Sequence, residues 1–195
     1  MALISVTSVA AVYLLFLAWR LGVHQRLPLA LGRISLEAIP DRAARRHGER
    51  PLFTTDESCA WSVPALAGRY PDPRTWSAVR IKATAALLAR MLRERLDICR
   101  GDRVAIVKTN HLDVHVLIAA VVRAGGVACP INGRFAAGHL RPYLLNIGAK
   151  VLISDVATLG RLLEEAAEFG PVERVVIADH RAPGDARAGA MTALL

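Results

Sequence analysis

The chain has 195 residues, enough for about one domain of ordinary size plus an appendage. Its hydrophobic content of 53% exceeds the roughly 45–50% found in soluble domains, which indicates that part of the chain lies in a non-aqueous environment. The formal charge of +8 would suit a nucleic-acid binder, but the sequence has no recognition-helix or stacking-aromatic pattern and only 5% aromatic residues, so we expect no nucleic-acid partner.

An apolar run at the N-terminus accounts for the excess of hydrophobic residues. Residues 2–19 contain no charged side chain, and at about 1.5 Å per helical residue this run nearly matches a hydrocarbon core of roughly 30 Å. Arg20, Arg26 and Arg33 follow it, which predicts that its C-terminal side lies in the cytoplasm. A cleaved signal peptide is the alternative, but Lys and Arg are absent before the run and no small-x-small cleavage site follows it. We therefore expect a single transmembrane anchor over residues 1–20.

Residues 21–50 form a basic juxtamembrane segment that includes a short predicted helix over residues 36–47. Its arginines are placed to bind anionic lipid headgroups, so membrane lipid is the expected partner. The three cysteines, Cys59, Cys99 and Cys129, show no metal-type or redox spacing. Reduced thiols in a domain on the cytoplasmic side of the membrane explain them best.

The remainder of the chain alternates between short apolar runs and amphipathic stretches. Helical spacing of apolar residues predicts helices over residues 76–96, 112–124, 136–147 and 156–169. Strands are predicted over residues 51–55, 103–107, 126–129, 150–153 and 174–178, with the third stopped by Pro130. Residues 64–73 read as a loop and residues 179–195 as an irregular tail. Apolar strands separated by helices predict an α/β fold, a partial parallel sheet with flanking helices.

Four sequence motifs in this order resemble one family. They are Arg74-Thr75-Trp76-Ser77, the run from Gly101-Asp102-Arg103 to Asn110, Arg123-Ala124-Gly125 with Pro130-Ile131-Asn132, and Gly148-Ala149-Lys150-Val151-Leu152. The order is similar to that of the N-terminal subdomain of the adenylate-forming superfamily, which includes the acyl-CoA synthetases. The resemblance covers about residues 48–178, so residues 51–178 are expected to be a partial AMP-binding subdomain. The anchor and the Arg-Thr-Trp start look more like the fatty acid transport and very-long-chain branch.

The resemblance implies an AMP-forming fatty-acyl-CoA ligase, which makes acyl-CoA, AMP and pyrophosphate from ATP, fatty acid and coenzyme A. ATP, Mg²⁺ and coenzyme A are thus implied for the complete enzyme. The family's phosphate loop is absent from these 195 residues, and its adenine motif, ribose-binding aspartate and catalytic lysine would lie beyond them. We therefore expect an N-terminal fragment with no catalytic, cofactor-binding or metal residues of its own, completed by a C-terminal portion or a separate chain. The alternative is a membrane-tethered binding or scaffold module, without catalytic activity, derived from such a ligase.

Polar residues at the end of the second predicted strand are the first candidates for a site. Lys108, Thr109 and Asn110 follow that strand, and the carboxyl ends of parallel strands are where α/β folds bind ligands. The interpretation that we favour makes Asn110 the N-cap of the next helix, with Asp113 adding negative charge to its first turn.

Three further groups of polar residues have simpler explanations than a site. His111 and His115 are spaced i, i+4 as in some metal sites, but no third ligand is evident. Arg134 and Phe135 lie in a predicted loop that either docks the rest of the enzyme or is solvated. Ser154-Asp155 is predicted to cap the following helix.

Overall fold

The computed structural model describes residues 13, 16–17, 20, 35–55, 74–165, 167–178 and 192–194. The chain divides into two compact units, Met1–Ile39 and Pro40–Leu195. None of the helices within the described ranges is both long and apolar enough to cross a bilayer. Most of the predicted anchor, the juxtamembrane residues up to 34, the loop at 64–73 and most of the tail lie outside the described residues, as does Cys59.

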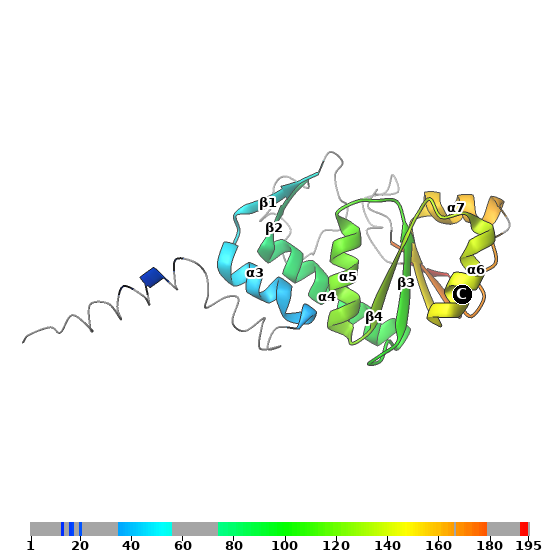
Figure 1. Cartoon of the computed structure of the whole chain (residues 1–195), viewed down its shortest axis with the longest axis horizontal. Helices are drawn as coiled ribbons and strands as arrows, with labels where there is room; N and C mark the ends of the chain where they lie inside the picture. Colours follow the sequence, from blue (N-terminus) through cyan, green and yellow to red (C-terminus); the bar gives the residue numbers. More distant parts are fainter. Residues whose placement is uncertain are drawn as a thin grey trace, which may run out of the picture. The chain divides into compact units, whose positions relative to one another are not determined.

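The second unit is built on a twisted sheet with helices on both faces (Figure 1). The described elements of the whole chain, in order, are η1 (Leu36–Ala38), α3 (Ile39–His47), β1 (Pro51–Thr54), β2 (Thr75–Ser77), α4 (Ala78–Leu96), β3 (Arg103–Lys108), α5 (Asp113–Ala124), β4 (Val127–Asn132), α6 (Ala137–Ile147), β5 (Val151–Ser154), α7 (Val156–Glu164), β6 (Arg174–Ile177) and β7 (Thr192–Leu194). The strand order of the main sheet is β4-β3-β5-β6-β7, and β1 pairs with β2 in a separate antiparallel sheet. The pairs β3-β4, β3-β5 and β5-β6 are parallel, which confirms the predicted fold class.

Alternate residues of each central strand face two different hydrophobic clusters. Val104 and Ile106 of β3 pack with buried residues of α4 and α5, whereas Ala105 and Val107 pack with buried residues of α6 and α7. Both faces of the sheet are therefore covered, and this is why the strands read as nearly continuous apolar runs.

Strand β4 continues through Pro130, so the prediction that the proline ends this strand is wrong. Pro130 pairs with Ile106, and β4 runs on to Asn132. The N–H group of Val127 donates to the Asp102 carbonyl on the β3 side. Successive backbone N–H groups of a strand point to opposite sides, so the nitrogen of Pro130, three residues later, points away from β3. Among the described residues β4 has no second neighbour, and an edge strand tolerates a proline whose missing donor faces outward.

Three other boundaries differ from prediction. The helix predicted over 76–96 begins at Ala78, because residues 75–77 form β2 and the Ser77 hydroxyl caps the helix by accepting from the Arg80 N–H group. The helix predicted over 156–169 ends at Glu164. The tail is not wholly irregular, since β7 pairs antiparallel with β6 and makes the sheet mixed. The remaining predicted helices and strands in the described ranges are confirmed to within about two residues.

Candidate functional site at the carboxyl edge of the sheet

The chain reverses its winding direction between β3 and β5. From β3 the chain moves to β4 on one side, and β5 then returns to pair with the other side of β3. Ligands of open α/β sheets bind outside the carboxyl ends of the strands at such a switch point. A cleft of about 650 Å³ lies there, lined by residues 108–110 after β3, residues 132–134 after β4, and Ala157, Thr158 and Arg161 of α7. We call it the switch-point cleft.

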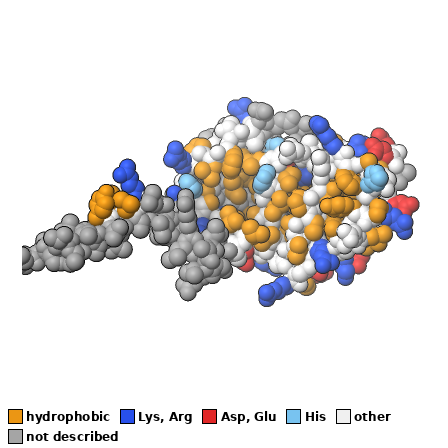
Figure 2. Space-filling view, in the orientation of Figure 1, with side chains coloured by type: hydrophobic (Ala, Val, Ile, Leu, Met, Phe, Trp, Pro, Cys, Tyr) orange, Lys and Arg blue, Asp and Glu red, His pale blue; other side chains and the backbone are white. Residues whose placement is uncertain are grey.

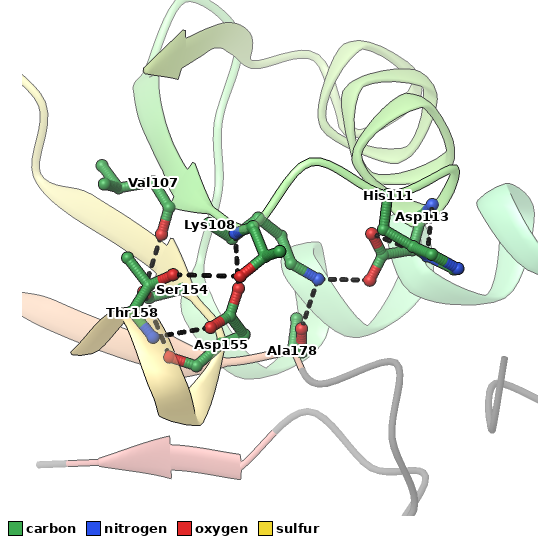
Figure 3. Close-up of polar contacts among 9 residues, drawn as sticks. Val107, Lys108, His111, Asp113, Ser154, Asp155, Thr158 and Ala178 are labelled. Carbon is green, nitrogen blue, oxygen red and sulfur yellow. Dashed lines mark hydrogen bonds and ion pairs between the residues drawn. The ribbon is translucent and has the colours of Figure 1, made fainter. Parts of the chain in front are cut away.

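Asp155 links the end of β5 to the end of β3 at one wall of this cleft (Figure 3). Its carboxylate accepts the Thr158 N–H group at 2.7 Å, which makes it the N-cap of α7, and the Thr109 N–H group at 2.6 Å. Burial alone would raise the pKa of Asp155, but these hydrogen bonds and the nearby Lys108 charge outweigh it and hold the pKa below its ordinary value. The predicted cap at residues 154–155 is thus confirmed for Asp155. The neighbouring Ser154 hydroxyl instead donates to the Val107 carbonyl at 2.7 Å.

Lys108 is fully buried at the end of β3 and joins three elements. Its ammonium group forms an ion pair with Asp113 in the first turn of α5 and donates to the Ala178 carbonyl, just after β6, at 2.8 Å (Figure 3). The prediction that Asn110 caps α5 is wrong, because the N-cap position is Leu112, and the first N–H group of the helix, that of Asp113, is accepted by the His111 side chain. The sequence did not indicate that Lys108 is buried, because its partners Asp113 and Ala178 lie 5 and 70 residues away.

A tight turn after β4 forms the opposite wall. A Cβ atom on Gly133 would collide with the Lys108 carbonyl oxygen, so only glycine allows this approach of the two backbones. The Asn132 side chain closes the turn by accepting the Arg134 N–H group at 2.9 Å. Arg161 holds the turn to α7, because its guanidinium donates to the Gly133 carbonyl at 2.7 Å and to Glu165 at 2.8 Å.

The switch-point cleft has the character of an anion site. Its lining includes three cationic side chains and no carboxylate, and the Asp155 carboxylate behind this lining is turned to the N–H groups of Thr109 and Thr158. Lys108 and Arg161 are held by Asp113 and Glu165, whereas the exposed Arg134 guanidinium has no ion pair within the described ranges. An anionic group in the cleft would therefore meet Arg134 together with hydroxyl and amide donors.

The two histidines do not share a helical face. His111 precedes α5, and its Nδ1 accepts the Asp113 N–H group at 3.3 Å, while His115 is exposed on α5. In the part of the chain that the structure describes, no group of three His, Cys, Asp or Glu residues is placed to hold a metal ion. Cys99 and Cys129 are free thiols, and burial raises the pKa of Cys129.

Comparison with known proteins decides the family. A family model described as "AMP-binding enzyme" matches residues 41–192, well over half of the chain. The chain belongs to this family. The resemblance inferred from the four sequence motifs is therefore confirmed, and the matched residues include strands β1 to β6 and the switch-point cleft.

The chain spans about a tenth to a fifth of the length of the curated relatives described next. Carboxylic acid reductase of Mycobacterium tuberculosis is 28% identical over 76% of this chain and 12% of its own length. The long-chain-fatty-acid–CoA ligase of Salmonella typhimurium is 24% identical over 73% of this chain and 22% of its own length. Among solved structures, the fold is similar to Mycobacterium tuberculosis fatty acyl CoA synthetase, with a TM-score of 0.57 and 23% identity over 74% of this chain and 26% of that one.

Proposed function

We propose that this chain is the N-terminal part of a membrane-anchored, AMP-forming fatty-acyl-CoA ligase and does not complete a turnover by itself. The observation that carries the proposal is the match to the AMP-binding family over residues 41–192, with a long-chain-fatty-acid–CoA ligase among the relatives. The chain spans about a fifth of that ligase, which supports the view that further sequence supplies the reaction centre.

The described residues fit only part of such an enzyme. Holding the phosphates of ATP requires backbone amides in a glycine-rich turn at a helix N-terminus, and Mg²⁺ requires oxygen ligands such as carboxylates. Neither arrangement is present in the described part of the chain, where the turns at the carboxyl edge contain the single Gly133 and the lining of the cleft has no acidic side chain. We therefore assign no step of the chemistry, and no ATP, Mg²⁺ or coenzyme A ligand, to this chain.

Membrane attachment is the second part of the proposal. Residues 1–20 would cross the bilayer, residues 21–50 would contact anionic headgroups, and the AMP-binding unit would lie on the cytoplasmic side. An anchor suits an enzyme whose acyl substrate partitions into lipid, because it holds the active site where the substrate is concentrated.

The test is the mass and activity of the native polypeptide. An antibody raised against residues 76–96 detects the protein in cell membranes, and the isolated material is assayed for acyl-CoA formation from ATP, fatty acid and coenzyme A. The proposal expects a band several hundred residues longer than 195, with activity, and no activity from the 195-residue chain. A band at the mass of 195 residues in inactive material would favour the scaffold-module alternative. Acyl-CoA formation by the 195-residue chain would contradict the claim that it is incomplete.

A further inference from the structure

A second cavity adjoins the switch-point cleft on the α5 side of the sheet. Its volume is about 270 Å³, and four of its lining residues also line the cleft: Lys108, Asn110, Asn132 and Gly133. The two cavities thus share a wall made by the ends of β3 and β4. We call the second cavity the α5 groove.

The lining that belongs to the α5 groove alone is entirely apolar. It consists of Ile106 on β3, Val114 on α5, and Pro130 and Ile131 on β4. Pro130 is exposed and Val114 is half-buried, so the groove opens to the surface. Figure 2 shows hydrophobic side chains gathered on the face that carries α5 and β4. Apolar surface of this kind is stabilised by covering it with apolar groups.

Charge distinguishes the two compartments. No Asp or Glu side chain lines either cavity, and the exposed residue Arg134 lines the switch-point cleft but not the α5 groove. One side of the shared wall therefore favours a negative charge and the other favours a hydrocarbon. A ligand that satisfies both is an amphiphile with one apolar chain and an anionic head.

We infer that the carboxyl edge binds a long-chain carboxylate, with its head at Arg134 in the switch-point cleft and the start of its chain in the α5 groove. The ligand class follows from the geometry, whereas its role as the substrate of the ligase rests on the proposed function. The site would receive the fatty acid on this subdomain, ahead of its activation elsewhere in the enzyme.

Calorimetry of the full chain in lipid nanodiscs tests the inference. The ligands are octanoate, decanoate, dodecanoate and dodecanol, and the heat of the same ligand with empty discs is subtracted. We expect affinity to rise about fourfold for each methylene added within the groove. We expect dodecanoate to bind more tightly than dodecanol, since only the carboxylate pairs with Arg134.

Two pairs of variants separate the site from general binding. Arg134→Gln should weaken carboxylate binding about threefold to fivefold and leave dodecanol unchanged, whereas Arg95→Gln, at an exposed site on α4, should change neither. Val114→Trp should fill the groove and abolish the dependence on chain length. Ile118→Trp, one turn further along α5 and outside both cavities, is the matched control. Urea midpoints of all four variants show whether each has kept its fold.

The position of the ligand is tested by a fatty acid with a photoreactive diazirine in its chain. We expect cross-linked peptides to contain Val114 or residues 130–131. Three results would each overturn the inference. They are an affinity that is independent of chain length, an equal loss of that dependence in Val114→Trp and Ile118→Trp, and cross-links confined to residues 1–20.

The two proposals fail in different ways. If the longer native protein forms acyl-CoA but no carboxylate binds at this edge, the proposed function is supported and the inferred site is wrong. Carboxylate binding here, with an inactive native protein, would leave the site and remove the ligase function.

Discussion

Replacing Lys108 by methionine should strongly destabilise the second unit. The lysine ammonium and the Asp113 carboxylate are both fully buried, and the ammonium also satisfies the Ala178 carbonyl. Methionine has a similar length but no charge, so Lys108→Met leaves a buried carboxylate without its cation. The neighbouring His111 Nδ1 lies 3.3 Å from that carboxylate but accepts the Asp113 N–H group, so it does not replace the lysine.

The magnitude follows from desolvation. Removing one partner of a buried ion pair costs about 3–5 kcal/mol, because the remaining charge stays out of water. Replacing both partners by apolar residues of similar volume removes the two desolvation penalties together. We therefore expect Lys108→Met to lose about 3–5 kcal/mol of unfolding free energy, and Lys108→Met/Asp113→Leu to lie within about 1 kcal/mol of the unaltered chain.

Urea unfolding of the full chain in detergent, followed by circular dichroism, measures these differences. The matched control is the exposed pair Arg90–Glu94 on α4, with 64% and 61% of the side chains exposed and an N–O distance of 3.7 Å. Arg90→Met should cost about 0.5 kcal/mol or less, since water screens this pair. A loss below about 1 kcal/mol for Lys108→Met, or a double variant as unstable as the single one, would refute the reasoning.

Three further changes test other parts of the edge and its supports. Asp155→Ala should cost about 1–2 kcal/mol and speed amide hydrogen exchange in the first turn of α7, because the helix loses its N-cap; unchanged exchange would contradict this. Gly133→Ala should lower the urea midpoint, because its Cβ would collide with the Lys108 carbonyl oxygen. Gly138→Ala, in α6 with open space around it, should instead stabilise the chain by up to about 1 kcal/mol. Equal effects of the two substitutions would contradict the close approach at Gly133. Hydrogen bonds from Lys82 and then Arg123 lower the pKa of Asp41. Its contribution to stability is therefore full above the ordinary value of 3.8 and is lost as the pH falls through the lower folded pKa. Asp41→Asn should remove that part of the acid dependence of the urea midpoint, and an unchanged profile would argue against the ion pairs.

Local sequence patterns predicted most of the elements. Apolar spacing located α4, α5 and α6, and short apolar runs located β3, β5 and β6, because helix and strand periodicity depends on which residues face a core. The cap at Asp155 was also predictable, since the carboxylate and the N–H group that it accepts are three residues apart.

Patterns failed where a partner is remote in sequence. Asn110 and Asp113 have the spacing of a capped helix start, yet Asp113 pairs with Lys108 and Asn110 does not cap α5. Strand β2 has three residues, too few for a period, and forms only because β1 lies beside it.

The sequence by itself determined the family, through its ordered motifs, and the alternation of helices and strands, through periodicity. The tertiary structure alone decided the strand order β4-β3-β5, which creates the switch-point cleft, and the edge position that lets Pro130 remain in a strand. It also decided that Lys108 is buried and that the exposed Arg134 lines the switch-point cleft, which shares a wall with the apolar α5 groove. The physical reason is that the spacing of apolar residues depends on which residues face a core, whereas a site depends on which segments, distant in sequence, pack against each other.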